Sequence, residues 1–368
     1  MNPNYHIADT TEIFSPALVF FKDIIQANIA TAVEQVGDPA KLRPHVKTHK
    51  TREIAQMELA AGLTKQKCAT LAEAEMLAGC GIRDVMLAYP MVGPNQARLA
   101  KLMKSFPEAT FSTIVDHEKP IRSLSEVMER EGLTAPVMLD VDAGMHRSGI
   151  ELGEEAAALY RLVHELPGLK AAGLHIYDGH HRNANVEERE KEIHEYFEQI
   201  MAFRKRLEEE GLPVEKLVVG GTPQFPVYAK VEGVECSPGT IFLHDGNTQG
   251  FPELEYTPAA VLLTRVISTP SRGRITLDLG YKAVASDPPL ENRVKLLNVP
   301  DARLVLQNEE HLVVETPNAD DFAPGDEVYA IPAHICPTCA LQEFAYVVED
   351  GHLVGEWKIA SRARSLGC

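Results

Sequence analysis

The strongest constraint on the fold is an alternation of short apolar segments with segments of helical periodicity, which runs from about residue 42 to residue 240. Near-continuous apolar strands separated by helices indicate a parallel sheet covered on both faces. The strand candidates are residues 43–48, 65–70, 84–90, 110–116, 136–142, 171–179, 216–222 and 234–240. Eight such units in about 200 residues predict a (β/α)8 barrel of the TIM type. A doubly wound open sheet is the alternative, but it favours a glycine-rich turn after the first strand, where this chain has none.

Local signals mark the ends of several expected helices. Thr70 and Glu73 form a capping-box pattern before an apolar run. Gly62, Gly132 and Gly211 stand where helices are expected to stop, because glycine adopts the left-handed conformation that ends many helices.

The pattern changes after about residue 256, where strand-like segments follow one another with turns such as "EDGH" between them. Helical periodicity is nearly absent there, which predicts an all-β domain of roughly 110 residues. The expected organisation is an N-terminal segment 1–15 that packs with the β-domain, a barrel over 16–255, and the C-terminal β-domain over 256–368.

Composition excludes some classes of partner. The chain of 368 residues has 45% hydrophobic residues and a formal net charge of −17, so nucleic acid and anionic membrane surfaces would repel it. The N-terminus lacks a signal-peptide pattern, and no run of about 18 apolar residues predicts a membrane span. Six cysteines are sparse for this length, which predicts a cytoplasmic protein with mostly reduced thiols.

Chemically capable residues gather at the predicted carboxyl ends of the strands, where active sites of such barrels lie. Lys47 ends the first strand, Arg147 follows the fifth, and Tyr177 ends the sixth. The segments "GGTP" (220–223) and "SPGT" (237–240) end the seventh and eighth. Each residue alone is better explained as part of a solvated loop, but their shared position favours a site.

A lysine at this edge is a candidate imine former, because desolvation lowers the pKa of its amine. The glycine-rich segments offer backbone N–H groups and threonine hydroxyls that suit a phosphate. Paired glycines also mark ordinary turns. Two such pairs on adjacent strands beside Lys47 nevertheless indicate pyridoxal 5'-phosphate (PLP).

The segments "RPHVKTHK", "DVDAGMHRSG", "GLHIYDGH", "GGTP" and "ECSPGT", in this order, resemble those of fold-type III PLP enzymes. More narrowly, the chain is similar to the D-threonine aldolase and D-serine dehydratase group, relatives of alanine racemase, from about residue 15 to its end. The resemblance implies that Lys47 holds PLP covalently, that Arg147 lies near its phenolic oxygen, and that Tyr177 lies by its ring. It also implies a phosphate site made by Gly221, Thr222, Gly239 and Thr240.

The chain departs from alanine racemase at Ser237, where that enzyme has an arginine that contacts the pyridine nitrogen. A neutral partner leaves the nitrogen unprotonated, which weakens the cofactor as an electron sink. Bond cleavage would then need help from another source, such as a metal ion.

A second candidate site lies in "PAHICPTCALQ" (332–342). On an extended chain His334 and Cys336 would project from the same face and could ligate one ion. The resemblance implies a divalent metal there, because this family has an H-x-D or H-x-C pair at this point. A thiolate favours zinc, whereas the carboxylate version suits manganese or magnesium. Cys339 could be a third ligand or a disulfide partner, and we expect an ordinary thiol.

Two reactions fit the resemblance. "HICPT" looks like the D-serine dehydratase version, whereas "GLHIYDGH" and "ECSPGT" look like the D-threonine aldolase version, and the aldolase is our prediction. The alternative is a dehydratase of D-serine or D-3-hydroxyaspartate that gives a keto acid and ammonia. A racemase would leave the metal pair unexplained. A PLP-binding protein without catalysis would be a single barrel without the β-domain. The family also implies a homodimer and a D-amino acid substrate.

Overall fold

The computed structural model describes residues 5–368, which divide into two units. The first, here called the parallel unit, comprises Ala32–Lys47, Ala55–Gly239 and Ala363–Cys368. The second, here called the antiparallel unit, comprises the chain up to Thr31 together with Thr48–Ile54 and Thr240–Arg362. Each unit is discontinuous in sequence, so the chain passes between them several times, once directly after Lys47.

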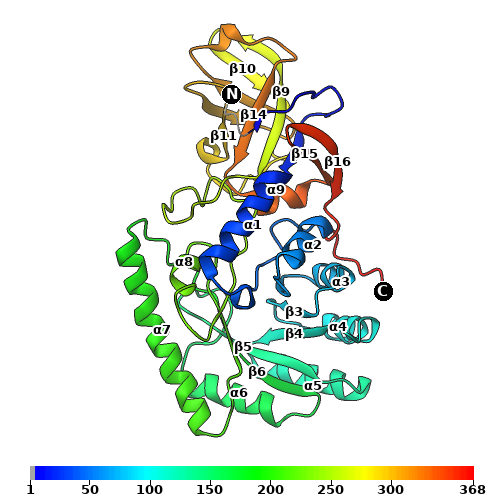
Figure 1. The fold of residues 1–368 in the computed structure, drawn as a ribbon, viewed down its shortest axis with the longest axis vertical. Helices are drawn as coiled ribbons and strands as arrows, with labels where there is room; N and C mark the ends of the chain where they lie inside the picture. Colours follow the sequence, from blue (N-terminus) through cyan, green and yellow to red (C-terminus); the bar gives the residue numbers. More distant parts are fainter. Residues whose placement is uncertain (1–4) are drawn as a thin grey trace. The chain divides into compact units, whose positions relative to one another are not determined.

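The parallel unit is built on a seven-stranded parallel sheet whose strands follow one another in chain order (Figure 1). Its strands are β2 (Lys65–Cys68), β3 (Asp84–Leu87), β4 (Thr110–Val115), β5 (Ala135–Val141), β6 (Leu169–Ile176), β7 (Lys216–Val219) and β8 (Glu235–Cys236). The predicted α/β class and parallel sheet are therefore confirmed. Because every strand runs the same way, the carboxyl ends of all seven lie at one edge of the sheet.

The first predicted strand, residues 43–48, does not form a regular strand. Residues 42–45 instead make two isolated parallel bridges, Leu42 with Cys236 of β8 and His45 with Lys67 of β2. Pro44 has no N–H to donate, so it contributes only its carbonyl, which accepts from Lys67 N at 2.8 Å. A turn follows at once. The segment is thus bonded to both edge strands of the sheet.

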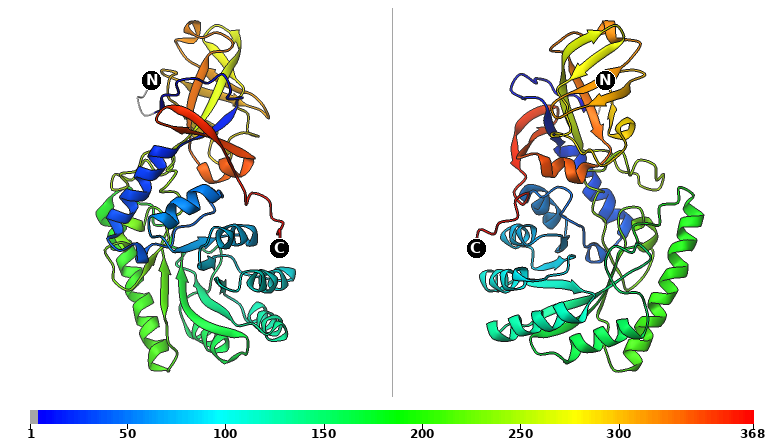
Figure 2. Two further views of the ribbon diagram at one scale, coloured as in Figure 1. Left: turned by 45° about the vertical axis from the view of Figure 1, so that its right-hand side comes forward. Right: turned by 180° about the vertical axis from the view of Figure 1, so that it is seen from behind.

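Helices connect the parallel strands and lie on the outside of the sheet (Figure 2). They are α3 (Leu71–Gly79), α4 (Pro94–Ser105), α5 (Glu118–Glu131), α6 (Glu154–Glu165), α7 (Val186–Glu209) and the short α8 (Phe225–Tyr228). Helices α1 (Lys22–Val36) and α2 (Arg52–Ala60) each span a boundary between the units, and a 3-10 turn covers Pro39–Lys41.

The predicted helix caps are present. The Thr70 side chain accepts a hydrogen bond from Glu73 N, and the Glu73 carboxylate accepts one from Ala69 N. Gly132 ends α5 with the left-handed conformation (φ 68°), which a residue with a Cβ adopts only at a cost.

A cluster of apolar side chains lies on the parallel sheet. Five buried side chains, one from each of β3 to β7, form a cluster that comprises Met86, Ile114, Met138, Ala172 and Val218. Burial of such a layer is the main source of stability for a parallel sheet.

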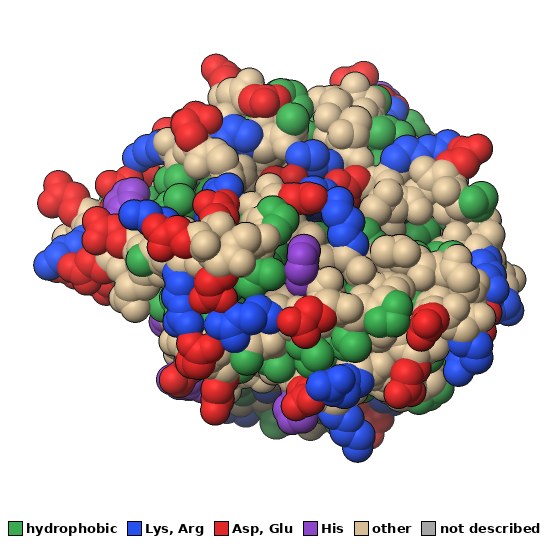
Figure 3. Space-filling model, turned by 90° about the horizontal axis from the view of Figure 1, so that it is seen from below, with side chains coloured by type: hydrophobic (Ala, Val, Ile, Leu, Met, Phe, Trp, Pro, Cys, Tyr) green, Lys and Arg blue, Asp and Glu red, His purple; other side chains and the backbone are tan. Residues whose placement is uncertain are grey.

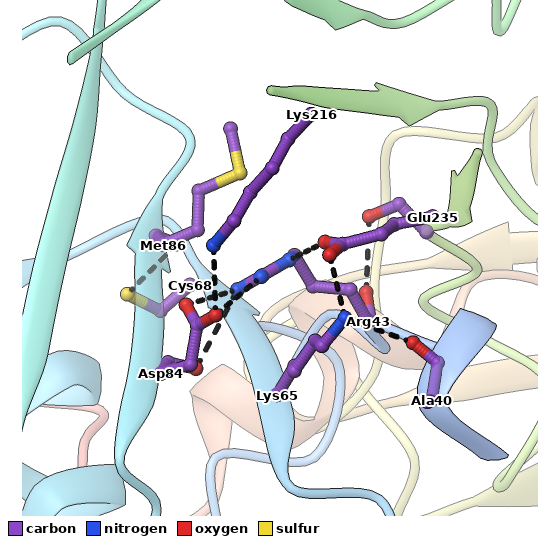
Figure 4. A network of polar contacts seen from close by, with 9 residues as sticks. Ala40, Arg43, Lys65, Cys68, Asp84, Met86, Lys216 and Glu235 are labelled. Carbon is purple, nitrogen blue, oxygen red and sulfur yellow. Dashed lines mark hydrogen bonds and ion pairs between the residues drawn. The ribbon is translucent and has the colours of Figure 1, made fainter. Parts of the chain in front are cut away.

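A charged network occupies the opposite edge of the sheet from the carboxyl ends of the strands (Figure 4). Arg43 is 1% exposed, donates twice to the Asp84 carboxylate at 2.8 and 2.9 Å, and donates to Glu235 at 2.6 Å. Lys216 pairs with Asp84 at 3.0 Å and Lys65 with Glu235 at 2.7 Å. Asp84, Glu235, Lys65 and Lys216 are each the first residue of a strand. The network therefore joins four strands at their starts, and its role is structural.

Replacement of Arg43 by methionine should destabilise the protein by about 3 kcal/mol, because two carboxylates would lose the buried cation that compensates them. The free energy of unfolding in urea measures this loss. Arg83→Met is the matched control, since Arg83 pairs with Glu108 at the surface and should contribute less than about 1 kcal/mol. Equal effects of the two substitutions would contradict the structural role of the network.

The antiparallel unit is built on a nine-stranded, mostly antiparallel sheet in the order β12-β13-β10-β9-β1-β15-β16, with β14 paired to β9 and β11 to β14. Its strands are β1 (Ala17–Phe21), β9 (Ala260–Ser271), β10 (Arg274–Leu277), β11 (Val294–Leu296), β12 (Arg303–Gln307), β13 (Leu312–Glu315), β14 (Glu327–Pro332), β15 (Phe344–Glu349) and β16 (His352–Lys358). Short helices cover Leu290–Asn292, Ala319–Asp321 and α9 (Ile335–Leu341).

An N-terminal strand completes this sheet. β1 pairs antiparallel with β9 and parallel with β15, although Phe20 and its partner Ala260 are 240 positions apart in the sequence. Its side chains enter a core with residues of the later strands: Val19, Phe21, Val261, Tyr329 and Tyr346. This segment falls within the predicted barrel range 16–255. In the structure it is instead a strand of the sheet of the antiparallel unit.

Acidic and basic side chains are interspersed over the molecular face that Figure 3 shows. Within residues 5–368, no helix combines the length and apolar composition that a bilayer crossing needs.

Candidate active site

A cavity opens at the carboxyl ends of the parallel strands, in the parallel unit. It is lined by Ala88, Ile114, Asp140, Val141, Met145, Arg147, Ser148, His175 and Tyr177. Two of the residues predicted to bind the cofactor, Arg147 and Tyr177, are therefore brought together. Ligands of parallel α/β sheets bind at this edge, because loops and unpaired strand ends meet there.

Arg147 and Tyr177 are in direct contact. The guanidinium carbon of Arg147 lies 4.8 Å from the centroid of the Tyr177 ring, a cation–π arrangement. The loop that carries Arg147 is pinned by Gly149, whose φ is +96° and where an added Cβ would lie 2.6 Å from Asp142 N. The spacing of arginine and glycine in "GMHRSG" thus has a geometric cause, since only glycine fits the return of this loop to its strand.

A buried hydrogen-bonded chain lies beside this pair. His175 Nδ1 is 2.7 Å from Asp140 Oδ1, and His175 Nε2 is 3.5 Å from Lys67 Nζ. Ser148 donates to the other oxygen of Asp140 at 3.0 Å. Burial lowers the pKa of His175, so the imidazole is neutral near pH 7. The sequence analysis did not identify Lys67 or Asp140, although a lysine inside the buried strand "KQKC" is a usable signal.

Lys47 stands in the turn that follows the bridged segment, and its side chain is half-buried. Its backbone N–H donates to His45 Nδ1 at 3.4 Å. The charge of Lys47 is one cause of the lowered pKa of Lys67. Lys67 Nζ itself lies 6.0 Å from the centroid of the Tyr177 ring, so one lysine of the parallel unit stands beside the Arg147–Tyr177 pair.

The predicted phosphate residues are partly assembled. Gly239 N donates to Thr222 Oγ1 at 3.1 Å, and Gly221 N donates to Gln224 Oε1 at 3.2 Å. A Cβ on Gly221 would lie 2.9 Å from the Tyr177 ring, so this position excludes any side chain. Three of the four predicted residues are thus in the parallel unit, two of them hydrogen-bonded to each other. The fourth, Thr240, is the first residue of a stretch that belongs to the antiparallel unit.

Ser237 is buried, and its hydroxyl donates to the Arg43 carbonyl at 3.1 Å. The side chain that stands at the racemase arginine position is therefore small, neutral and already engaged with the backbone.

The predicted metal pair lies in the antiparallel unit, and its local conformation differs from the expected extended chain. His334 is extended (φ −128°, ψ 98°), but α9 begins at Ile335, so Cys336 lies in its first turn. The two side chains remain close enough to interact. Cys336, as the largest cause, and the Asp287 carboxylate raise the pKa of His334 to about 9 against the effect of burial.

Two further residues contact the pair. Asp287 Oδ2 lies 2.6 Å from His334 Nδ1, which leaves Nε2 as the nitrogen available to a metal. Thr48, the residue that follows Lys47 in the chain, places its hydroxyl 3.1 Å from Cys336 Sγ. Asp287 was not predictable from sequence, because it lies 47 residues from His334 in an irregular segment.

Asp245 holds the backbone of the metal pair. It is 2% exposed, and its carboxylate accepts from Ile335 N at 3.1 Å, between the two candidate ligands. The same carboxylate accepts from Thr248, and Gly246 N donates to Pro332 O at 3.1 Å. This loop therefore fixes the point where the strand ends and α9 begins.

Cys339 is 0% exposed, and burial raises its pKa well above the ordinary value for a thiol. A metal ligand must be a thiolate, so this environment opposes ligation by Cys339. The ordinary-thiol interpretation fits this environment best.

Asp142, His146 and Glu151 form a separate group whose potential ligand atoms lie within 4.8 Å of one another. His146 and Glu151 are exposed, and Asp142 already accepts hydrogen bonds from Gly144 N and His146 N. Exposed acidic groups of this kind are common without an ion, so we assign no metal to them.

Comparison with known proteins shows which families the chain resembles. Residues 22–243 match the family described as "Alanine racemase, N-terminal domain", and residues 259–348 match the "Putative serine dehydratase domain". A D-threonine aldolase of Arthrobacter sp is 30% identical over 95% of this chain and 93% of its own length. A D-threo-3-hydroxyaspartate dehydratase of Delftia sp. is 25% identical over 89% of this chain and 92% of its own length.

The fold has a similar relative among solved structures. The D-threonine aldolase from Filomicrobium marinum superposes with a TM-score of 0.87 at 26% identity, over 96% of each chain. The resemblance predicted from "RPHVKTHK" and the segments after it is thereby confirmed. The chain belongs to the alanine racemase N-terminal domain family, the fold-type III PLP enzymes, within which it is a lyase similar to D-threonine aldolases and hydroxyaspartate dehydratases.

Proposed function

We propose that this protein is a D-threonine aldolase that depends on PLP and a divalent metal and cleaves D-β-hydroxy amino acids to glycine and an aldehyde. The observation that carries the proposal is the contact of Arg147 with the Tyr177 ring, with Gly221 against the same ring, at the carboxyl ends of the parallel strands. The 30% identity to a D-threonine aldolase over 95% of the chain supports this reaction over others in the family.

The residues present fit PLP. Lys47 offers the amine for covalent attachment, Arg147 a cation for the phenolic oxygen, and Tyr177 a ring edge against Gly221. A Cβ at Gly221 would fill the space next to that ring, and Thr222 and Gly239 already form a hydrogen-bonded corner suited to a phosphate. When bound, PLP supplies an electron sink for the electron pair released from the broken Cα–Cβ bond.

We also propose that the parallel unit is a closed (β/α)8 barrel in which residues 42–46 serve as the first strand. Its bridges to β2 and β8 support closure. The division into a segment 1–15, a barrel domain 16–255 and a β-domain 256–368 stays a proposal, supported by family matches over 22–243 and 259–348.

The residues present also fit a divalent metal held by His334 and Cys336. Their side chains meet, Asp287 orients the imidazole, and Asp245 fixes the intervening backbone. Thiolate and imidazole ligands favour zinc over manganese or magnesium. A metal with two protein ligands keeps positions for water and substrate, and it lowers the pKa of a hydroxyl that it binds.

The chain's own groups have definite tasks in this proposal. Retro-aldol cleavage removes the β-hydroxyl proton, breaks the Cα–Cβ bond, releases the aldehyde and returns one proton to Cα. Lys47 would free its amine as substrate binds, and the Arg147 guanidinium would hold an anionic oxygen. Ser237, being neutral, supplies no proton to the cofactor ring. The electron sink is then weaker, which is why we expect the metal to be needed.

The alternative is a dehydratase of D-serine or D-3-hydroxyaspartate. Its support is the H-x-C form of the metal pair and the 25% identity to a D-threo-3-hydroxyaspartate dehydratase. The same cavity would then serve removal of the α-proton and loss of the β-hydroxyl.

The two proposals give different products. The purified protein with PLP and zinc should convert D-threonine to glycine and acetaldehyde, and a chelator should stop the reaction. Pyruvate and ammonia from D-serine, without glycine from D-threonine, would establish the dehydratase instead. Turnover of L-threonine at the same rate would contradict both.

We further propose a cytoplasmic homodimer. The sparse, free cysteines support a reducing compartment, and the dimer is carried from the family resemblance. Sedimentation of the purified protein tests the oligomeric state.

A further inference from the structure

The proposed reaction assigns no role to the buried amine of Lys67. Lys67 of β2 is 3% exposed, and its Nζ lies 6.0 Å from the centroid of the Tyr177 ring and 3.5 Å from His175 Nε2. Lysine is almost never this buried unless it is paired or used. A chain that needed only packing here would be more stable with an apolar residue.

Lys67 lies at one end of the hydrogen-bonded chain Asp140–His175–Lys67, in which the carboxylate determines which ring nitrogen of His175 carries the proton. The Asp140 carboxylate can only accept at Nδ1 of His175, so that nitrogen carries the proton and Nε2 presents its lone pair to Lys67. Lys67 therefore donates to Nε2 both as an amine and as an ammonium. It can gain a proton without any rearrangement of this hydrogen-bonded chain, and Asp140 then compensates the new charge through the imidazole.

The charges that face Lys67 are unbalanced. Burial lowers the pKa of Lys67 to about 7, and three cations add to this effect: Lys47, Arg43 and Arg147. Asp140 is the one carboxylate among the causes and acts in the other direction. His175, neutral by burial, and the Tyr177 ring also lie beside Lys67. An anionic oxygen placed among these cations would raise the pKa of Lys67 and so favour its protonated form.

We propose that Lys67 is the proton-accepting group of this site, which takes up one proton from solvent when the phenolic oxygen of PLP, as an anion, binds beside Arg147. The inference rests on the proposed function, since it needs PLP at Lys47. The step is a protonation in which Lys67 Nζ gains one proton from solvent and one positive charge; it is separate from the attachment of PLP to Lys47, which forms a C=N bond and releases one water. Protonated Lys67 would be a second cation beside the phenolic oxygen, in addition to Arg147, and would stabilise its anionic form. Ser237 is neutral and does not oppose this effect. Lys67 thus acts through its charge on the phenolic oxygen, whereas Lys47 binds the cofactor covalently.

Proton uptake can be measured by titration of PLP into the apoprotein in two buffers of different ionisation enthalpy. At pH 8 the free protein should have Lys67 mostly neutral, so the wild type should take up between about half and one proton more per site than Lys67→Met or Lys67→Gln. Below about pH 6 this difference should vanish, because Lys67 is then already protonated. The wild-type pH profile alone tests the inference if a variant folds poorly.

Lys170→Met is the control, because Lys170 is a surface residue of β6 paired with Glu215, and it should behave like the wild type. Inorganic phosphate is the second control and should cause no Lys67-dependent uptake, since it lacks the phenolic oxygen. Equal uptake by wild type and both Lys67 variants, with PLP covalently bound in all, would overturn this inference and leave the proposed function standing. Uptake that appears with phosphate, or only when glycine is added to the loaded protein, would also overturn it. Absence of covalent PLP in the wild type would instead overturn the proposed function.

Discussion

Replacement of Lys47 by alanine is expected to abolish covalent attachment of PLP and to lower the rate of D-threonine cleavage by at least about a thousand-fold. Lys47 is the amine in the turn after the bridged segment, and its loss removes both the covalent link and a group able to move protons at the reacting carbon. The absorbance band of the lysine-bound cofactor and the rate of glycine formation measure the two losses separately.

Lys67→Met is the matched control for this substitution, because Lys67 is the other lysine whose amine faces the same site. We expect it to retain covalent PLP. If the cofactor stays attached in Lys47→Ala and is lost in Lys67→Met, the assignment of the two lysines is reversed.

Replacement of His334 by alanine or of Cys336 by serine should lower zinc binding and reduce activity by about a hundred-fold or more, because a metal supplies several kcal/mol of charge stabilisation to such a reaction. Metal content by atomic absorption and the rate with added zinc measure both effects. Chelation of the wild type should give a similar loss, reversed by zinc, whereas zinc should not restore the variants.

Cys339→Ser is the control for the thiol. Cys339 is buried in the same helix, and its raised pKa keeps it protonated, so this variant should retain its metal and most of its activity. Asp287→Asn should have an intermediate effect, with a loss of about ten- to a hundred-fold in metal affinity, since Asp287 only orients His334. Full activity of His334→Ala without metal would show that the pair is not a catalytic site.

Much of the fold was predictable because local periodicity and long-range packing agree in this chain. The apolar segments that end near Val141 and Ile176 are strands β5 and β6, and the capping box at Thr70 begins α3. The segment 43–48 was not a regular strand because Pro44 cannot donate to a ladder and a turn begins directly after His45. The pairing of β1 with β9 and β15 could not be predicted, since no local pattern encodes a partner more than 200 residues away.

The site was predictable where a residue type itself carries the chemistry. Lys47, Arg147 and Tyr177 were chosen for their position at strand ends, and the structure brings Arg147 against Tyr177. Asp287 and Asp245 were missed because a carboxylate that orients another residue has no distinctive sequence pattern. Lys67 was missed for a different reason: its charge inside an apolar strand was visible, but only the fold shows which residues it faces.

The most direct test of the central claim uses D-threonine that carries deuterium at Cα. Cleavage of the Cα–Cβ bond leaves the Cα–deuterium bond untouched, so the account predicts acetaldehyde and glycine that retains one deuterium at early times, measured by mass spectrometry. Dehydration must first remove the deuterium from Cα. Formation of 2-oxobutanoate and ammonia, with the deuterium released to solvent, would contradict the account.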